Sequence, residues 1–241
     1  MIKITYLDHS GFVVTLAKAI LVFDYFRDPS HSLNKILGDY PGLPVVFFAS
    51  HRHPDHYNQS IYATAQNRRR VYVLSNDIDA KKIPTTLEVE GMSPGDYKEG
   101  LPGEISVKAY PSTDEGVSFL VTLADGKKIF HAGDLNDWHW QDESTFREVE
   151  IASMHYRKIL KRIADENPRL DIVFFPVDPR QGSDFERGAR EFLSAVRVEN
   201  FFPMHFDGKY RAACNFAAYN SGNETRCFCL HHPGHSVEID A

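Results

Sequence analysis

The stretch Ser50-His51-Arg52-His53-Pro54-Asp55-His56 decides how the rest of the chain is interpreted. It follows the apolar run 45–49, whose β-branched and aromatic residues come after a proline and predict a buried strand. Three imidazoles and a carboxylate therefore gather at the C-terminal end of a strand, which is where open sheets place their sites. Neutral imidazole and carboxylate are the ligands that a divalent metal prefers. The stretch predicts a metal centre, and the alternative is a polar turn that is rich in histidine.

Several motifs together carry a family resemblance. The pattern His51-x-His53-x-Asp55-His56 resembles the HxHxDH signature of the metallo-β-lactamase fold superfamily. Phe130-His131-Ala132-Gly133-Asp134 is similar to its Gly-Asp motif, and Phe202-Pro203-Met204-His205 to its last histidine motif. The opening residues 4–12 and 21–24 resemble the first hairpin of its metal-dependent hydrolase branch, which includes sugar-lactone hydrolases. The resemblance implies one α/β domain over 1–241, a four-layer αββα sandwich of two mixed β-sheets with outer helices.

Composition narrows the class of protein. The chain of 241 residues is 42% hydrophobic and 25% charged, which is ordinary for a globular domain. A net charge of -6 argues against a general nucleic-acid binder, which would carry a basic face. There is no leader-like start and no apolar stretch near the roughly 20 residues of a membrane span. Three cysteines, an odd and small number, suit a reducing compartment, so we expect a cytoplasmic protein without a membrane partner. The oligomeric state stays open.

The hydrophobic pattern predicts β hairpins followed by α/β units, and this order occurs twice along the chain. The expected strands are 2–7, 12–25, 45–49, 71–74, 86–89, 104–109, 117–123, 128–131, 172–175 and 200–202. The expected helices are 31–37, 58–67, a short one before Pro84 that is capped by Asn76 or Asp77, 142–166, 184–196 and 210–219. In the longest helix, the apolar residues at helical spacing are Phe146, Val149, Ile151, Met154, Ile159, Leu160 and Ile163.

The resemblance also implies roles for individual ligands. His51 and His53 would bind a first metal ion. Asp55 and His56 would turn to a second ion, with His205 completing that site. Asp134 would be the carboxylate that bridges the two ions, which such a group can hold about 3.5–4 Å apart.

One motif departs from the superfamily pattern. The superfamily offers a histidine that completes the first site, but this chain has no histidine between His56 and His131. Counting back from Gly116, Ser112 occupies its position, and a serine hydroxyl is a poor zinc ligand. The first metal site is then weak or empty. The alternative is that Asp114 or His139 takes the place of the absent histidine as a ligand. Two further groups, His9 and Asp24, are expected near the site as support for its ligands, the alternative being that they are ligands themselves.

Catalytic and substrate-binding groups are expected around the metals. Asp55 would orient the attacking hydroxide or hold its proton, and His139 or water would protonate the leaving group. Trp138 and Trp140 would form a pocket wall. An anionic part of the substrate would be bound by Arg180 or Lys209, the alternative being that both are surface charges.

A second histidine-rich stretch, Cys227-x-Cys229-x-His231-His232-x-x-His235, lies near the C-terminus. Alone it could be a structural zinc site, although its spacing matches no common pattern well. The alternation of Cys227 and Cys229, and of Val237 and Ile239, fits closing strands better.

The leading hypothesis is a metal-dependent hydrolase, in which a metal-activated hydroxide attacks an ester, lactone or amide bond of a small molecule. The alternatives are a phosphodiesterase acting on a nucleotide or nucleic acid, against which the acidic charge argues, and a non-catalytic metal or ligand binder. The cofactor would be one or two divalent ions, with zinc first and manganese, iron or nickel also compatible with these ligands.

Overall fold

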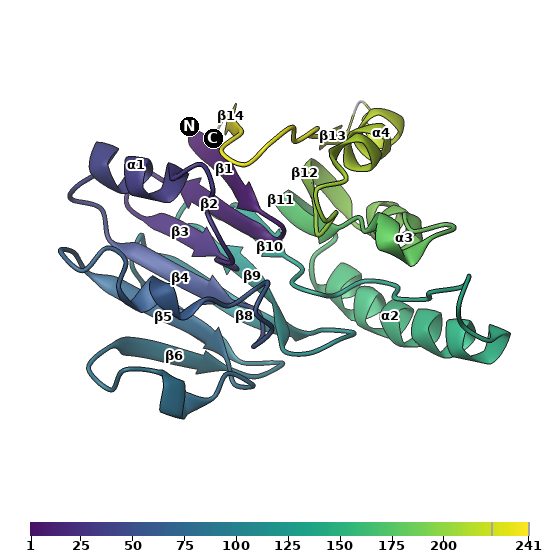
Figure 1. Ribbon diagram of the computed structural model, residues 1–241, viewed down its shortest axis with the longest axis horizontal. Helices are drawn as coiled ribbons and strands as arrows, with labels where there is room; N and C mark the ends of the chain where they lie inside the picture. The colour runs from purple at the N-terminus through teal and green to yellow at the C-terminus, as the bar shows by residue number, and fades with distance from the viewer. Residues whose placement is uncertain (223, 241) are drawn as a thin grey trace.

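The computed structural model describes residues 1–222 and 224–240, and within them the chain forms two seven-stranded sheets with helices outside (Figure 1). The first sheet has the order β14-β1-β2-β3-β4-β5-β6 and the second the order β13-β12-β11-β10-β9-β8-β7. Both sheets are mixed, with antiparallel strands such as β1 and β2 and parallel ones such as β11 and β12. The αββα sandwich that the family resemblance implied is confirmed.

The strands of the first sheet are β1 (Ile2–Asp8), β2 (Gly11–Thr15), β3 (Ile20–Phe23), β4 (Val45–Ala49), β5 (Arg70–Ser75), β6 (Glu88–Met92) and β14 (Ser236–Ile239). Those of the second sheet are β7 (Tyr97–Leu101), β8 (Ile105–Pro111), β9 (Val117–Thr122), β10 (Lys128–His131), β11 (Arg169–Pro176), β12 (Arg197–Met204) and β13 (Arg226–Cys227). The α-helices are α1 (Ser32–Asp39), α2 (Phe146–Glu166), α3 (Arg187–Ala195) and α4 (Tyr210–Asn220).

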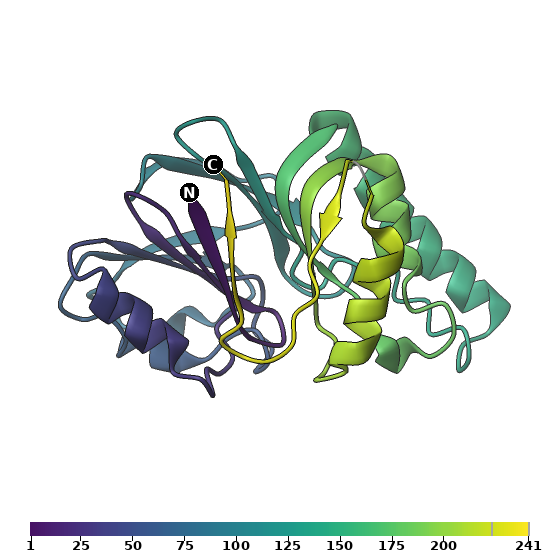
Figure 2. The same cartoon turned by 90° about the horizontal axis from the view of Figure 1, so that it is seen from above.

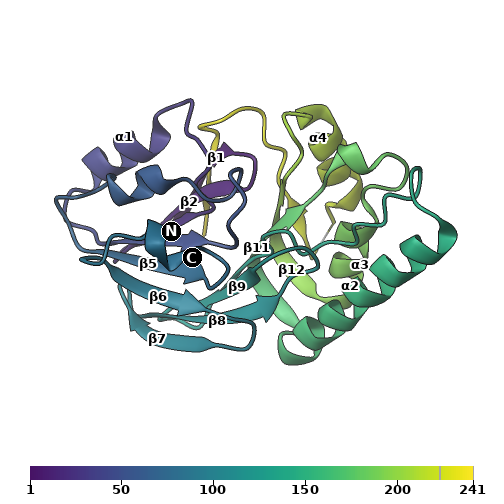
Figure 3. The ribbon, with the colours of Figure 1, turned by 60° about the horizontal axis from the view of Figure 1, so that its bottom comes forward.

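Figure 3 shows α1 on the outer side of the first sheet and α2, α3 and α4 on the outer side of the second. Between the sheets lies a core of aromatic and aliphatic side chains. Phe12 of β2, for example, packs on Phe174 of β11 with ring centroids 4.3 Å apart. This burial of apolar surface holds the two sheets face to face, so that loops of both sheets meet at a common edge.

Three expectations for local structure were wrong. Residues 58–67 do not form an α-helix: only Gln59–Tyr62 is helical, as a 3₁₀ turn, and Ala65 has a left-handed φ of 56° that a continuing helix excludes. Strand β7 was missed because four of its five residues are exposed and give no apolar alternation. The short helix before Pro84 is a 3₁₀ turn over Ala80–Lys82 whose cap is Asp79, since the side chain of Asp79 accepts a hydrogen bond from Lys81 N–H.

The expected apolar face of α2 is correct only in its C-terminal half. Ile159, Leu160 and Ile163 are buried, whereas Ile151 is 57% exposed and Phe146 is 84% exposed. The helix begins with a capping box, in which Thr145 and Glu148 satisfy each other's backbone N–H groups. A cap stabilises the first turn locally, so the helix extends beyond the part that packs on the sheet (Figure 1).

The C-terminal segment crosses from the second sheet to the first (Figure 2). Strand β13 pairs with β12, and β14 then pairs with β1 on the other sheet. Cys229 lies beyond β13 and not in a strand as expected. It forms a disulfide with Cys214 of α4, in contrast to the expectation that all three cysteines are reduced.

Candidate metal centre

The site lies where strands of both sheets end. In the first sheet β3 and β4 are parallel, and β1 runs in the same direction because two antiparallel pairings relate it to β3. In the second sheet β10, β11 and β12 are parallel, and β8 shares their direction by the same argument. The polar residues at or just after these C-terminal ends are His9, Asp24, His51, His53, Asp55, His56, Asp114, Asp134, Asp178 and His205.

The first ligand group consists of His51, His53, Asp114 and Asp134, whose potential ligand atoms lie within 4.8 Å of one another. His51 Nε2 is 3.0 Å from His53 Nδ1. Asp114 Oδ2 is 3.7 Å from the same His53 nitrogen. Asp114 therefore stands with the first pair of histidines, where the sequence lacks the expected third imidazole.

The second ligand group consists of His9, Asp55, His56 and His205, again with ligand atoms within 4.8 Å. His9 Nε2 lies 3.3 Å from Asp55 Oδ2. His9 directly follows β1, 42 residues before His51, and it was expected near the site as a possible ligand or as support for one. The structure brings its ring among the ligand atoms themselves.

Asp134 lies between the two groups. Its Oδ1 is 3.1 Å from His56 Nε2 and 3.4 Å from His205 Nε2. Its Oδ2 is 3.5 Å from His51 Nε2. Each carboxylate oxygen thus faces one group, which is the arrangement that a bridging carboxylate requires.

Buried polar atoms without partners test whether metal ions fit this place. Among the described residues, His9 Nε2, His56 Nε2 and Asp134 Oδ1 are buried and make no well-aligned hydrogen bond. Unpaired buried polar atoms are rare in proteins because each has lost its water without replacement. Here the three atoms converge with imidazole and carboxylate neighbours, so a divalent cation would satisfy them together.

Comparison with known proteins agrees with this geometry. Residues 3–153 match the family described as "Beta-lactamase superfamily domain". The chain belongs to the β-lactamase superfamily. It is 26% identical over 258 residues to a metal-dependent hydrolase of Pyrococcus furiosus, covering 99% of this chain and 100% of that protein. This likeness supports the expected class, a metal-dependent hydrolase.

Solved structures show the same fold. Igni18, a metallo hydrolase from Ignicoccus hospitalis, superposes with a TM-score of 0.69 at 17% identity, covering 100% of this chain and 99% of that one. CmlA, a diiron β-hydroxylase from Streptomyces venezuelae, gives a TM-score of 0.67 at 12% identity and covers 99% of this chain and 54% of that one. At these identities the likeness concerns the fold of this β-lactamase superfamily member.

Buried carboxylates orient two of the candidate ligand histidines of this superfamily member. Asp24, fully buried, accepts hydrogen bonds from the backbone N–H and the hydroxyl of Ser50, and its Oδ2 lies 2.7 Å from His56 Nδ1. Asp178 Oδ2 lies 2.9 Å from His205 Nδ1. In both pairs the carboxylate fixes one ring nitrogen, so the other, Nε2, points to the centre. The sequence reasoning did not select Asp178, although a polar residue between the end of β11 and Pro179 was a usable signal.

Electrostatics couple these groups. Burial would raise the pKa of Asp134, but His56 and His205 outweigh it and hold that pKa well below its usual range. Burial also opposes protonation of His205, yet Asp134 and Asp178 raise its pKa to about 9. Burial lowers the pKa of His51. A cation must replace the proton on a protonated ligand imidazole. Cation binding to this candidate centre would therefore be coupled to proton release.

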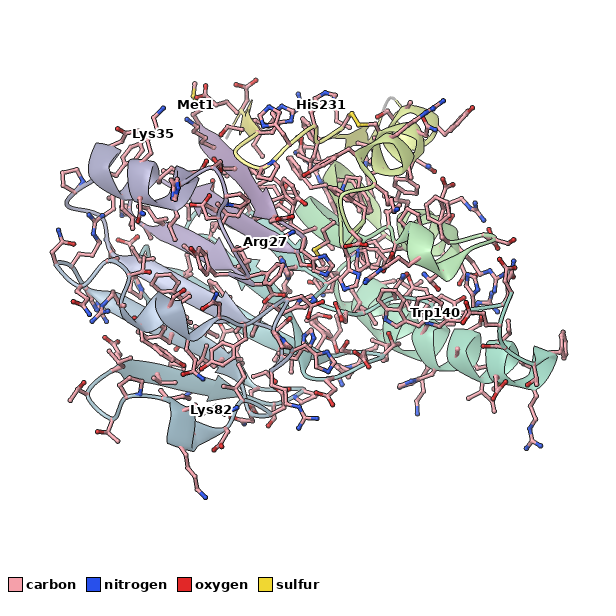
Figure 4. The ribbon with its side chains drawn as sticks, in the orientation of Figure 1. Met1, Arg27, Lys35, Lys82, Trp140 and His231 are labelled. Carbon is pink, nitrogen blue, oxygen red and sulfur yellow. A yellow bond between two sulfur atoms is a disulfide. The ribbon has the colours of Figure 1, made fainter. Side chains whose placement is uncertain are left out.

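Two cavities flank the centre. One of about 280 Å³ is lined by Trp138, Trp140 and Arg180, together with residues of both ligand groups. The other, of about 320 Å³, is lined by Arg27, Asp55, Arg180 and neighbouring residues. Arg180 lines both cavities. Figure 4 labels Trp140, which lines the first cavity, and Arg27, which lines the second. Substrate-sized space is thus available on either side of Arg180.

Three residues selected from the sequence lie elsewhere. His139 Nε2 faces the backbone oxygen of Asp184 at 3.1 Å, and its Nδ1 accepts a hydrogen bond from the backbone of Gln141 at 3.1 Å. With both nitrogens engaged in this way, His139 is not positioned as a metal ligand or as an acid for the leaving group. Ser112 Oγ lies near Asp114 N–H and is outside both ligand groups. Lys209 is exposed and lines neither cavity.

Proposed function

We propose that the protein hydrolyses an ester, lactone or amide bond of a small molecule and holds two divalent cations to do so. The observation that carries the proposal is the position of Asp134, with one carboxylate oxygen facing each ligand group and the whole opening on a cavity of about 280 Å³. A single ion leaves one of these two carboxylate oxygens unused, whereas two ions about 3.5–4 Å apart can use both.

His51, His53 and Asp114 would hold the first cation, and His9, Asp55, His56 and His205 the second, with Asp134 shared. When bound, the cations would acidify a water molecule and polarise the oxygen under attack. Zinc suits the second group, which offers three imidazoles. The first group offers two carboxylates with its two imidazoles, so manganese and iron suit it as well as zinc.

The indoles of Trp138 and Trp140 would bind an apolar part of the substrate. The two rings are stacked with centroids 6.4 Å apart, and Trp138 Nε1–H donates to the backbone oxygen of Asp134 at 2.7 Å. The wall is therefore anchored directly to the residue that the two ligand groups share. Rigid aromatic surface beside a polar centre orients a substrate at small entropic cost.

Arg180 would bind an anionic or carbonyl group of the substrate. Its Nη2 donates to Asp178 Oδ2 at 2.7 Å, which fixes the guanidinium while 40% of the side chain stays exposed. Asp178 in turn is held ionised, since hydrogen bonds from His205 and Arg180 outweigh its burial and lower its pKa to about 2. Arg180 thus presents a stable positive charge between the cavities.

Asp55 would orient the attacking water by accepting its hydrogen bond. The carboxylate is 39% exposed on the 320 Å³ cavity and lies beside His9. The hydrogen bond with His9 lowers the pKa of Asp55, so the group is ionised at neutral pH and able to accept.

The first test is metal stoichiometry by elemental analysis, combined with turnover of a lactone, a simple ester and a phosphodiester. We expect about two ions per chain and hydrolysis of the lactone or ester. Asp134→Ala should lose at least one ion and all turnover. Asp114→Asn should lose one ion, whereas Glu115→Gln, the neighbouring carboxylate, should retain both.

The control is informative because Glu115 Oε2 also lies 3.5 Å from His53, at its Nε2. Loss of an ion from Glu115→Gln but not from Asp114→Asn would transfer the ligand role to Glu115. Turnover of the phosphodiester alone would favour the phosphodiesterase alternative. Metal-replete protein that turned over none of the three substrates would favour the non-catalytic binder.

A second candidate function rests on the donor set of the first group. Two histidines and a carboxylate with open positions form the set that non-haem ferrous iron uses in oxygenases. His51, His53 and Asp114 supply that set, and the structurally similar CmlA is named a diiron β-hydroxylase. Oxygen uptake by the ferrous-loaded, reduced protein would support this candidate, and hydrolysis without any oxygen uptake would exclude it.

A further inference from the structure

Two sulfur atoms from separate elements meet in the C-terminal part of the chain, outside the two ligand groups described above. Cys214 belongs to α4, and Cys229 lies two residues after β13 on the segment that crosses between the sheets. Their Cα atoms are 4.4 Å apart, and the sulfurs are joined in a disulfide. Reduction would leave two thiols facing each other on a scaffold of helix and extended chain.

One imidazole lies beside this pair, and a second imidazole stacks on the first. Both ring nitrogens of His231 lie near Cys229 Sγ, at 3.6 Å and 3.7 Å. The potential ligand atoms of Cys214, Cys229 and His231 all lie within 4.8 Å of one another. The ring of His235 stacks on His231 with centroids 5.3 Å apart, and its Nδ1 is buried without a hydrogen-bond partner among the described residues. Figure 4 labels His231 on this C-terminal segment, away from Arg27 and Trp140.

We propose that the reduced protein binds a soft divalent cation of the zinc type between Cys214, Cys229 and His231, at a site separate from the hydrolytic centre. Two thiolates and an imidazole are ligands that zinc prefers, and His235 or water would complete a tetrahedral set. The hydrolytic centre contains no sulfur ligand, so the two sites differ in chemical character.

The disulfide and the cation exclude each other, because metal binding needs the two thiolates that oxidation removes. The oxidant is a small-molecule disulfide such as glutathione disulfide. One thiolate attacks it and releases one glutathione thiolate. The other thiolate then attacks the mixed disulfide, forming the Cys214–Cys229 bond and releasing a second glutathione and the cation. Two electrons pass from the protein sulfurs to glutathione disulfide, and two protons convert the released thiolates to thiols.

The third cysteine is a natural control. Cys227 is free, and burial raises its pKa to about 11, so it stays a thiol at neutral pH. Cys227 lies in β13, two residues before Cys229. It is not a member of the group formed by Cys214, Cys229 and His231. Its replacement should leave the cation site intact.

Either crosslink would fasten α4 to the segment that joins the two sheets. Phe228 of this segment stacks on Phe202 of β12 at 4.3 Å. Further along, Gly234 N–H donates to the backbone oxygen of Tyr6 in β1 at 2.7 Å. The site therefore lies on the connection between sheets, where a cation in the reduced protein would take over the tethering role of the disulfide.

Cobalt(II) tests the proposal because thiolate–cobalt charge-transfer absorption reports sulfur ligands alone, whatever the hydrolytic centre binds. We expect reduced wild-type protein to gain about one equivalent of thiolate-bound cobalt, and zinc to displace it. Protein oxidised with glutathione disulfide should show none. Cys227→Ser should keep the band, whereas Cys214→Ser and Cys229→Ser should each lose it.

A second measurement needs no variant and so does not depend on the folding of the substituted proteins. Zinc should protect two thiols of the reduced wild type from a thiol-modifying reagent, and protection should be absent after chelation. Absence of the cobalt band in reduced wild type, or its loss from Cys227→Ser, would overturn the proposed site, as would equal thiol reactivity with and without zinc. None of these results depends on hydrolytic activity.

Discussion

Asp114 places a negative charge where a third imidazole was expected. Together with Asp134 it gives the first ligand group two carboxylates, which attract a divalent cation more strongly than neutral ligands and favour harder metals. Counting from Gly116 placed the absent histidine at Ser112, and Asp114 was one of the two residues expected to substitute for it. The count could not tell which side chain of the loop turns inward, because that direction depends on the backbone conformation of the turn.

Glu166 is a single carboxylate whose charge affects stability. Lys108 donates to it at 2.6 Å and Tyr110 O–H at 2.6 Å, and these hydrogen bonds lower its pKa to about 2. A lowered folded-state pKa contributes stability above the unfolded value of 4.5, and the contribution is lost as pH falls from there to about 2. The group is 35% exposed, so after allowance for solvent screening we expect at most about 1 kcal/mol.

The variant Glu166→Gln should therefore be less stable than wild type at pH 7, and the difference should shrink towards pH 3. Urea unfolding of both proteins at the two pH values measures it. A difference that stays the same at pH 3 would show that shape, and not charge, is what Glu166 contributes.

At the scale of elements, the loop between β8 and β9 packs closely against the end of β4. Gly116 has a φ of 68°, and a Cβ there would lie 2.0 Å from the backbone oxygen of Ser50 and 2.5 Å from His51 Cβ. Val117 N–H also donates to that Ser50 oxygen at 2.9 Å. Only glycine allows both this backbone conformation and this approach, which brings Asp114 next to His51.

Gly116→Ala should cost about 3 kcal/mol or more, because a left-handed alanine costs about 1–2 kcal/mol and overpacking adds about 1–3. Gly126→Ala is the matched control, since Gly126 also has a positive φ of 88° but open space around it. That variant should lose only the conformational part. Denaturant unfolding compares the two, and equal losses would mean that the crowding at Ser50 is relieved by a small backbone shift.

Helix α2 offers a test of its two halves. Ile163 is fully buried and Ile151 is 57% exposed, although both belong to the apolar positions expected from the sequence. Ile163→Ala should cost about 2–5 kcal/mol through lost burial and a cavity, and Ile151→Ala less than about 0.5 kcal/mol. Thermal and urea unfolding would measure the pair. A large loss at Ile151 would indicate that a partner or a second copy covers this part of the helix in solution.

At the scale of the whole molecule, the proposed cations would join the two sheets. His9 and His51 come from loops of the first sheet, whereas Asp134 and His205 come from the second. Ligands that bind only the folded state stabilise it, by about 2.7 kcal/mol at a free concentration one hundred times Kd. Removal of metal by a chelator should lower Tm, and metal added back should restore it in a concentration-dependent way.

Asp134→Ala provides the control for that experiment, since it removes the carboxylate common to both ligand groups. Chelator should shift its Tm much less than that of wild type. The same large shift in both proteins would mean that the stabilising metal sits elsewhere, for example between Cys214 and Cys229. Calorimetry on metal-free and metal-loaded samples of wild type and Asp134→Ala measures the Tm shift of each protein and so distinguishes these two outcomes.

The local motif around His51 could be predicted from the sequence because ligand spacing is a property of neighbouring residues, whereas the sandwich was predicted from the family resemblance and not from strand periodicity alone. The sequence was insufficient for selecting Asp178 and for placing the ring of His9 among the ligand atoms. Their approach to the motif depends on which strands lie next to each other in the sheets, and many topologies share the same local pattern. The 3₁₀ turn at Gln59–Tyr62 and the exposed strand β7 were missed because neither leaves an apolar periodicity.

The pairing of β14 with β1 has a consequence for synthesis on the ribosome. Ile2 lies opposite Ile239 and Thr5 opposite Ser236, so the N-terminal strand is matched by residues that are translated more than 230 positions later. Until those residues emerge, one edge of the nascent first sheet has unpaired backbone groups and is open to intermolecular association. His9 follows this strand directly, so the order of translation makes the metal centre one of the last parts of the protein to reach its final surroundings.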